Sequence, residues 1–270
     1  MASGTPRGRR RWAVAGLALL VLAAAAGFAA WRRGGRSDVQ RGHDLAAQHG
    51  CFGCHGPGGV RGFVDESDGG VGDVPPFAHD ELHAYAQNEG EIREWITDGM
   101  PRRLREEEGA ESGPARLIVM PAFRQRLSAR EIDQVVAYVK AVADYDRPES
   151  GPIAEGLAVG ARLGCFTCHG PQGRGTPPNP GSFRGYIPAW DGADFEELAR
   201  DEGEVREWIL DGSPRRLRDH LVAAWFLQRQ TLRMPAYRGR VSEQELEALL
   251  RYIRALRQAG APGGARPAVQ

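Results

Sequence analysis

The chain has 270 residues, enough for two modest domains and an additional segment, and its formal net charge is zero. Hydrophobic residues make up 41% of it and charged residues 26%, as in folded globular proteins, which excludes a disordered or collagen-like chain. Residues 38–150 carry 21 acidic and 12 basic side chains, so we expect no nucleic-acid partner.

Residues 12–31 are predicted to form a transmembrane helix. This stretch has no charged side chain, and its twenty residues are about the length that an α-helix needs to cross the hydrocarbon core. Trp12 and Trp31 stand at its two ends, where aromatic residues meet the membrane surface. The basic segment 1–11 is expected to stay in the cytoplasm. A cleaved signal peptide is the alternative, because a basic start, an apolar stretch and small residues near 27–30 also fit that design.

The four cysteines fall in two pairs, each followed at once by histidine. The motifs read CFGCH at residues 51–55 and CFTCH at residues 165–169, and CxxCH is the c-type haem attachment pattern. A disulfide framework would not need the histidine, and a zinc site would need a second, distant pair of histidines. A thioredoxin-like pair would not occur twice with histidine attached. Covalent haem is therefore the preferred interpretation.

Two copies of one unit make up the rest of the chain. The segment EIREWITDGMPRRLR at 91–105 recurs as EVREWILDGSPRRLR at 204–218, and the two CxxCH motifs keep nearly the same offset. A short linker with proline and glycine separates the copies. The predicted domains are residues 38–147 and residues 152–260, and residues 261–270 are predicted to form a flexible tail.

Each unit is predicted to be mainly helical, because no segment shows the alternating pattern of a strand. The expected helices cover residues 38–49, about 91–98 and the segment after 128 in the first unit, and residues 153–163, 195–211 and the segment after 242 in the second. A capping box opens each closing helix, Ser128 with Glu131 and Ser242 with Glu245.

The order of helix, CxxCH, irregular loop, helix, Met-Pro and closing helix resembles the class I cytochrome c domain. The pair is similar to dihaem cytochromes of the c4 kind and, with its anchor, to the dihaem subunit of cbb3-type oxidases. The repeated EWI-DG-PRRLR segment and the long loop after it are not features of either narrower family. The resemblance implies a mainly α fold, in which an N-terminal transmembrane helix precedes two tandem class I cytochrome c domains.

The resemblance also implies two covalent haem c groups with iron. The implied cofactor-binding residues are Cys51, Cys54 and His55 in the first unit, and Cys165, Cys168 and His169 in the second, with both histidines as iron ligands. Because haem is attached to CxxCH outside the cytoplasmic membrane in this family, the domains are expected to face the periplasm. The chain would then be a single-pass protein of the bacterial inner membrane.

Met120 and Met234 are the candidates for the second iron ligand. Each lies 65 residues after the histidine of its motif and precedes proline. Met100 has Ser213 at the matching position of the other unit, and a shared role needs a shared residue. The alternative is that both Met-Pro dipeptides belong to the core. The other histidines have no counterpart across the repeat, namely His43, His49, His79, His83 and His220.

We expect an electron carrier with no catalytic residues, rather than an enzyme. It would pass single electrons between a respiratory donor and a terminal oxidase or reductase, so its partner would be an oxidase, a reductase or another cytochrome. Ligation by His and Met raises the haem potential above that of bis-His ligation. The alternatives are a dihaem cytochrome c peroxidase and a haem-based redox or gas sensor, each of which needs an iron with an open coordination position.

Two further features distinguish parts of the repeat. The segment before the first Met-Pro is acidic and is expected to be exposed, whereas the segment before the second, residues 219–233, is apolar and is expected to pack against the first domain or a partner. The repeated pair Arg102–Arg103, matched by Arg215–Arg216, is a candidate for binding haem propionates, with solvated surface as the alternative.

Overall fold

The computed structural model describes residues 6–62, 74–77, 79–110, 118–148 and 150–260. It divides into two units, Met1–Gly35 and Arg36–Gln270. The first unit contains the helix α1 (Pro6–Gly34). Within α1, the span Val14–Trp31 is long and apolar enough to cross a membrane, a criterion that a signal sequence also meets. The tail predicted at residues 261–270 lies outside the described residues.

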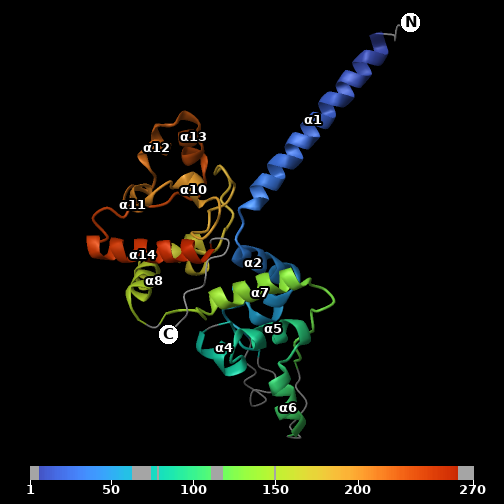
Figure 1. Ribbon diagram of the computed structural model, residues 1–270, viewed down its shortest axis with the longest axis vertical. Helices are drawn as coiled ribbons and strands as arrows, with labels where there is room; N and C mark the ends of the chain where they lie inside the picture. The colour runs from blue at the N-terminus through green and yellow to red at the C-terminus, as the bar shows by residue number, and fades with distance from the viewer. Residues whose placement is uncertain (1–5, 63–73, 78, 111–117, 149, 261–270) are drawn as a thin grey trace. The chain divides into compact units, whose positions relative to one another are not determined.

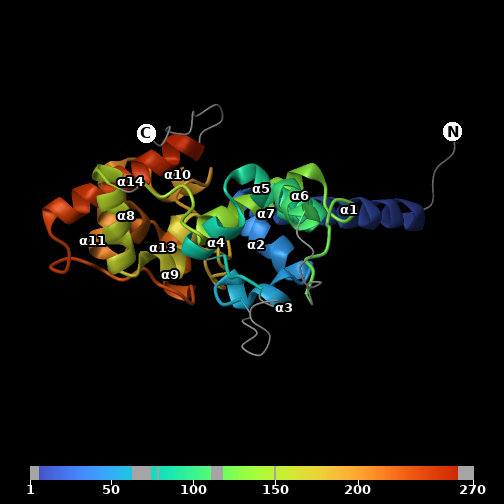
Figure 2. The ribbon, with the colours of Figure 1, turned by 90° about the horizontal axis from the view of Figure 1, so that it is seen from below.

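The second unit contains two copies of one helical arrangement (Figures 1 and 2). The first copy consists of α2 (Asp38–Gln48), α3 (Cys51–His55), α4 (His79–Tyr85), α5 (Glu89–Asp98), α6 (Arg102–Ala110) and α7 (Ala129–Val142). The second consists of α8 (Pro152–Arg162), α9 (Cys165–His169), α10 (Phe195–Leu198), α11 (Glu202–Asp211), α12 (Arg215–Asp219), α13 (Leu221–Arg229) and α14 (Glu243–Gly260). A 3₁₀ turn follows each motif, η1 (Pro57–Gly59) and η2 (Pro171–Gly173). The described residues thus confirm the mainly helical prediction.

In each copy the first helix crosses the closing helix at a glycine, α2 on α7 and α8 on α14 (Figure 1). A Cβ atom on Gly42 would lie 1.9 Å from the backbone oxygen of Gln134, and one on Gly156 would lie 2.2 Å from that of Ala248. The backbones therefore touch directly, and no larger residue fits at either crossing. Around each crossing a separate hydrophobic core forms.

The closing helices begin at the predicted capping boxes. The backbone N–H of Ser128 donates to the carboxylate of Glu131 at 2.8 Å, and that of Ser242 donates to Glu245 at 2.8 Å. The helix predicted over 195–211 is wrong in one respect, because the chain is extended at Ala199 and α10 ends there. The next helix, α11, begins at Glu202.

An ion pair joins two consecutive helices in each copy. Glu91 on α5 accepts from the guanidinium of Arg103 on α6 at 2.9 and 3.0 Å, and Glu204 on α11 accepts from Arg216 on α12 at 2.6 and 2.8 Å. The hydrogen bonds from Arg216 lower the pKa of Glu204 to about 2. The carboxylate is therefore charged at neutral pH and holds α12 against α11.

Replacing the crossing glycine should destabilise the protein. We predict that Gly156→Ala lowers the free energy of unfolding by about 3 kcal/mol, because the backbones must separate to admit the methyl group. Gln48→Ala, at an exposed position of the equivalent helix in the first copy, should change it by less than about 0.5 kcal/mol. Denaturant titration followed by circular dichroism measures both. A Gly156→Ala protein as stable as the wild type would refute the close crossing.

Replacing Arg216 should lower the free energy of unfolding and make it depend less on pH in the acid range. Folding lowers the pKa of Glu204, so the ion pair of Glu204 with Arg216 stabilises the folded state to its full extent above the ordinary pKa of 4.5. This contribution is lost as the pH falls toward about 2. We predict that Arg216→Gln costs about 2 kcal/mol at pH 7 and flattens the decline of stability below about pH 5. Arg215→Gln, at the exposed neighbouring position, is the control and should cost less than about 0.5 kcal/mol. Equal losses in the two variants would contradict the assignment.

Candidate haem-binding sites

Each CxxCH motif forms one turn of helix immediately after a glycine in the left-handed conformation. Gly50 and Gly164 adopt φ values of +79° and +74°, which glycine accommodates without strain and which end the preceding helix. In a helix the two cysteines of each motif, three positions apart, lie on one side. All four thiols are free of disulfide bonds. The turn thus presents two thiols and an imidazole together.

In the first site, a backbone carbonyl and an aromatic ring fix the orientation of the His55 imidazole. Its Nδ1 lies 2.7 Å from the backbone oxygen of Pro75, to which it donates in the tautomer that leaves Nε2 free. The ring of Phe77 lies 4.7 Å from the imidazole centroid. Hydrogen bonding of one imidazole nitrogen fixes the ring for metal binding through the other. His55 is therefore oriented as an iron ligand should be.

In the second site, counterparts of these residues surround His169. Trp190 takes the place of Phe77, with ring centroids 5.1 Å apart. Burial lowers the pKa of His169 to about 4, so the imidazole is neutral at pH 7, the form that binds metals. The carbonyl of Pro188 opposes this shift, although its geometry falls short of a hydrogen bond to the buried Nδ1.

The closing helix secures the turn that follows each motif. Tyr138 on α7 donates its hydroxyl to the backbone oxygen of Gly58 at 2.8 Å, and Tyr252 on α14 donates to that of Gln172 at 2.9 Å. Burial raises the pKa of Tyr138 to about 12, so the phenol keeps the proton it donates. A tyrosine of the closing helix therefore fixes the turn that follows each haem motif.

The Met-Pro segments run along the ends of α5 and α11. A Cβ atom on Gly99 would lie 2.3 Å from the oxygen of Met120, and one on Gly212 would lie 2.6 Å from that of Met234. Both glycines have positive φ, so each position needs glycine for two reasons. Met120 and Met234 are each half-buried against the core of their own copy.

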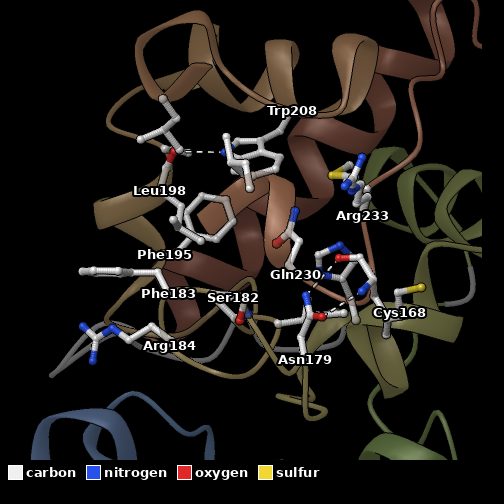
Figure 3. A pocket seen from close by; sticks show the side chains of 18 of the residues that line it. Cys168, Asn179, Ser182, Phe183, Arg184, Phe195, Leu198, Trp208, Gln230 and Arg233 are labelled. Atoms are coloured by element: carbon white, nitrogen blue, oxygen red, sulfur yellow. Dashed lines mark hydrogen bonds between the residues drawn. The ribbon is translucent and has the colours of Figure 1, made fainter. Parts of the chain in front are cut away.

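The second copy encloses a cavity of about 370 Å³, shown in Figure 3. Its lining includes Cys165, Cys168, His169 and Met234, four residues that the sequence predicts to hold one haem. The rest of the wall is largely apolar, with Trp190, Phe195, Trp208, Val222 and Phe226 among its members. Thiols, an imidazole and a thioether around a large apolar space fit an iron porphyrin.

Hydrogen bonds brace this cavity at two places (Figure 3). At one side the indole of Trp208 donates to the backbone oxygen of Leu198 at 2.9 Å. Nearer the cysteines, Asn179 donates to the oxygen of Leu232 at 3.0 Å and accepts from its N–H at 2.8 Å. The second pair ties the loop after the motif to the Met-Pro segment, which fixes opposite walls of the cavity.

In the first copy, Cys51 and Met120 pack against one core that also contains Phe77, the residue in contact with His55. The predicted site residues are therefore also brought to one region there. Met100 lies instead at the junction of α5 and α6, next to the buried Pro101.

The competing histidines whose side chains are described have other contacts. His43 lies against Phe52 and Tyr138, His49 against Phe123, and His83 against Tyr145. His220 caps α13 by accepting from Ala223 and also borders the cavity. Of these four histidines, His220 alone lines the cavity of the second copy.

Two kinds of contact escape sequence reasoning. The proline and aromatic residue behind each histidine, Pro75 with Phe77 and Pro188 with Trp190, lie in segments that look irregular, although the repeat offset aligns them. The arginine pairs are candidates for haem propionates or solvated surface, but in the structure Arg103 and Arg216 are bound to Glu91 and Glu204. Neither Arg215 nor Arg216 lines the cavity.

Comparisons with known proteins agree with this duplication. Residues 37–139 match the family of cytochrome c oxidase, cbb3-type, subunit III, and residues 153–257 match the cytochrome c family. No curated protein matches the chain. Each match covers one copy of the repeat and its CxxCH motif. The chain therefore consists of an N-terminal apolar helix followed by two tandem cytochrome c domains.

Proposed function

We propose that this dihaem cytochrome c is anchored in the bacterial inner membrane and passes single electrons on the periplasmic side, between a respiratory donor and a terminal oxidase or reductase. The observation that carries the proposal is the apolar cavity bordered by Cys165, Cys168, His169 and Met234. The similarity of the first domain to an oxidase subunit favours an oxidase as the acceptor.

In this proposal the cysteines hold two haems through thioether bonds, and each iron is bound by one histidine and one methionine. The cysteines are Cys51, Cys54, Cys165 and Cys168, and the iron ligands are His55 with Met120 and His169 with Met234. Haem iron supplies a one-electron couple when bound. The protein keeps its ligands fixed, through the carbonyl behind His55 and the tyrosine bonds to the motif turn, so that little has to move when the charge changes.

The apolar surroundings favour the less charged, reduced state. Burying a net charge in a poorly solvating cavity costs free energy, and the oxidised haem carries one positive charge more than the reduced haem. Methionine ligation acts in the same direction. Both effects raise the potential, which suits a carrier that delivers electrons to an oxidant.

Contacts between the two domains support a relay. The side-chain oxygen of Gln40 on α2 accepts from the backbone N–H of Thr176 at 2.9 Å. The amide of Gln172 donates to Asp144, just after α7, at 2.9 Å. Gln172 and Thr176 lie in the segment directly after the second motif. The segment after the second CxxCH motif thus contacts the first domain.

The methionine assignment can be tested one haem at a time. We predict that Met120→Ala and Met234→Ala each abolish the methionine-to-iron charge-transfer band of one oxidised haem. Each should lower the potential of that haem by on the order of 100 mV, a small part of the range that axial ligands span. Met100→Ala is the matched control and should change neither. A second haem that lacks this band in the wild type, and whose bis-histidine spectrum is kept in Met234→Ala and lost in His220→Ala, would assign the ligand to His220 instead.

The anchor can be tested by following the N-terminus of the expressed protein. We predict that the mature chain keeps residues 1–35 and stays in the membrane fraction after an alkaline carbonate wash. A version in which a cleavable signal peptide replaces residues 1–35 should be released as a soluble protein with both haems. A mature wild-type protein that begins after residue 27 and is soluble would establish a signal peptide instead.

A further inference from the structure

The helix α13 has one face on the cavity and another in solvent. Ala223, Phe226 and Leu227 line the cavity. Leu221 and Trp225, one turn apart on the other side, are 87% and 51% exposed. The helix α13, which precedes the Met-Pro of the second copy, therefore lines the cavity and also exposes apolar side chains to solvent.

Two apolar side chains beside this stripe also line the cavity: Val222 is 55% exposed, and Phe183 is 45% exposed and packs edge-on against Phe226, with centroids 5.2 Å apart. Leu221 and Trp225 do not line the cavity, and we define these two as the α13 face. Folded proteins usually bury or cover neighbouring large apolar side chains.

Basic residues flank this face without carboxylate partners. The guanidinium of Arg229 lies 4.7 Å from the ring of Trp225, and Arg233 donates to the backbone oxygen of Gln228 at 2.5 Å. Among the described residues no carboxylate is within ion-pair distance of either arginine. The corresponding part of the first domain is the opposite, with Glu106 and Glu107 exposed on α6.

We propose that the α13 face docks on the surface of an anionic phospholipid membrane. This inference rests on the proposed membrane anchor, which would keep the second domain at a high effective concentration near lipid. Tryptophan and leucine beside arginine are the combination that binds at the boundary between headgroups and acyl chains. The apolar side chains would enter that boundary, while Arg229 and Arg233 contact phosphate groups.

The size of the face favours lipid over a stable protein partner. A helix of nine residues is about 14 Å long and about 10 Å wide. One side of a typical stable protein interface covers about 800 Å², several times the area of such a helix. A bilayer needs no matching surface, so a short stripe is sufficient when a second anchor is present.

Hydrogen exchange of the full-length chain in nanodiscs tests this directly. With the anchor inserted, we predict that the amides of α13 exchange about tenfold more slowly in nanodiscs of phosphatidylcholine with phosphatidylglycerol than in phosphatidylcholine alone. Molar salt and the Arg229→Gln/Arg233→Gln variant should each reduce this difference. Leu221→Ser/Trp225→Ser should abolish it, whereas Val60→Ser, which changes a 59% exposed valine of the first domain, should not.

Haem spectra of every variant establish that the fold is intact. Equal exchange in both lipids, or an unchanged difference in Leu221→Ser/Trp225→Ser, would overturn the proposal. So would slowing that appears only after addition of a purified oxidase, which would make the face a protein docking site, or slowing that rises with protein concentration, which would indicate a second copy. Failure of the chain to enter nanodiscs would refute the anchor alone, and anionic vesicles added to the protein would then still test α13.

Discussion

The close crossing of the first and closing helices is the constraint on which each domain depends. At Gly42 and at Gly156 the helix backbones touch, and this contact places Tyr138 and Tyr252 over the turn that follows the CxxCH motif. This turn also binds the segment that carries the proline and the aromatic residue next to each histidine. The backbone N–H of Phe77 donates to the oxygen of Gly59, and that of Trp190 donates to the oxygen of Gly173. A domain of about 100 residues buries little apolar surface alone, so we expect a large covalent cofactor to complete its core.

The two domains share this scaffold but differ on their surfaces, and the differences lie mostly between the glutamate–arginine pair and the Met-Pro. In the first domain α6 exposes carboxylates, whereas in the second α13 exposes apolar side chains with arginines beside them. A duplicated electron carrier with two unlike faces can meet two unlike partners. The repeated histidine and Met-Pro pattern in both copies gives no support to a peroxidase or sensor, since each of these functions needs one site that differs from the other.

Much of the fold followed from the sequence because the signals are local. The CxxCH motifs, the capping boxes at Ser128 and Ser242 and the helical spacing behind them depend on neighbouring residues alone. The break at Ala199 did not follow, since this residue is buried in the wall of the cavity, a contact that local propensity does not report. The ring contact between Trp190 and His169 was missed for a similar reason, because it joins residues far apart in an irregular segment. The domain limits at 38–147 and 152–260, and the ligand roles of the methionines, remain predictions.

The most direct test of the central claim is a haem count with a carbon monoxide challenge on the purified full-length protein. A pyridine haemochrome assay should find two covalent haems per chain, and neither reduced haem should bind carbon monoxide, because in our proposal Met120 and Met234 would take the position that carbon monoxide needs. One haem, or ready binding of carbon monoxide at either iron, would contradict the account of two six-coordinate electron-transfer sites and would make a peroxidase or sensor the better explanation.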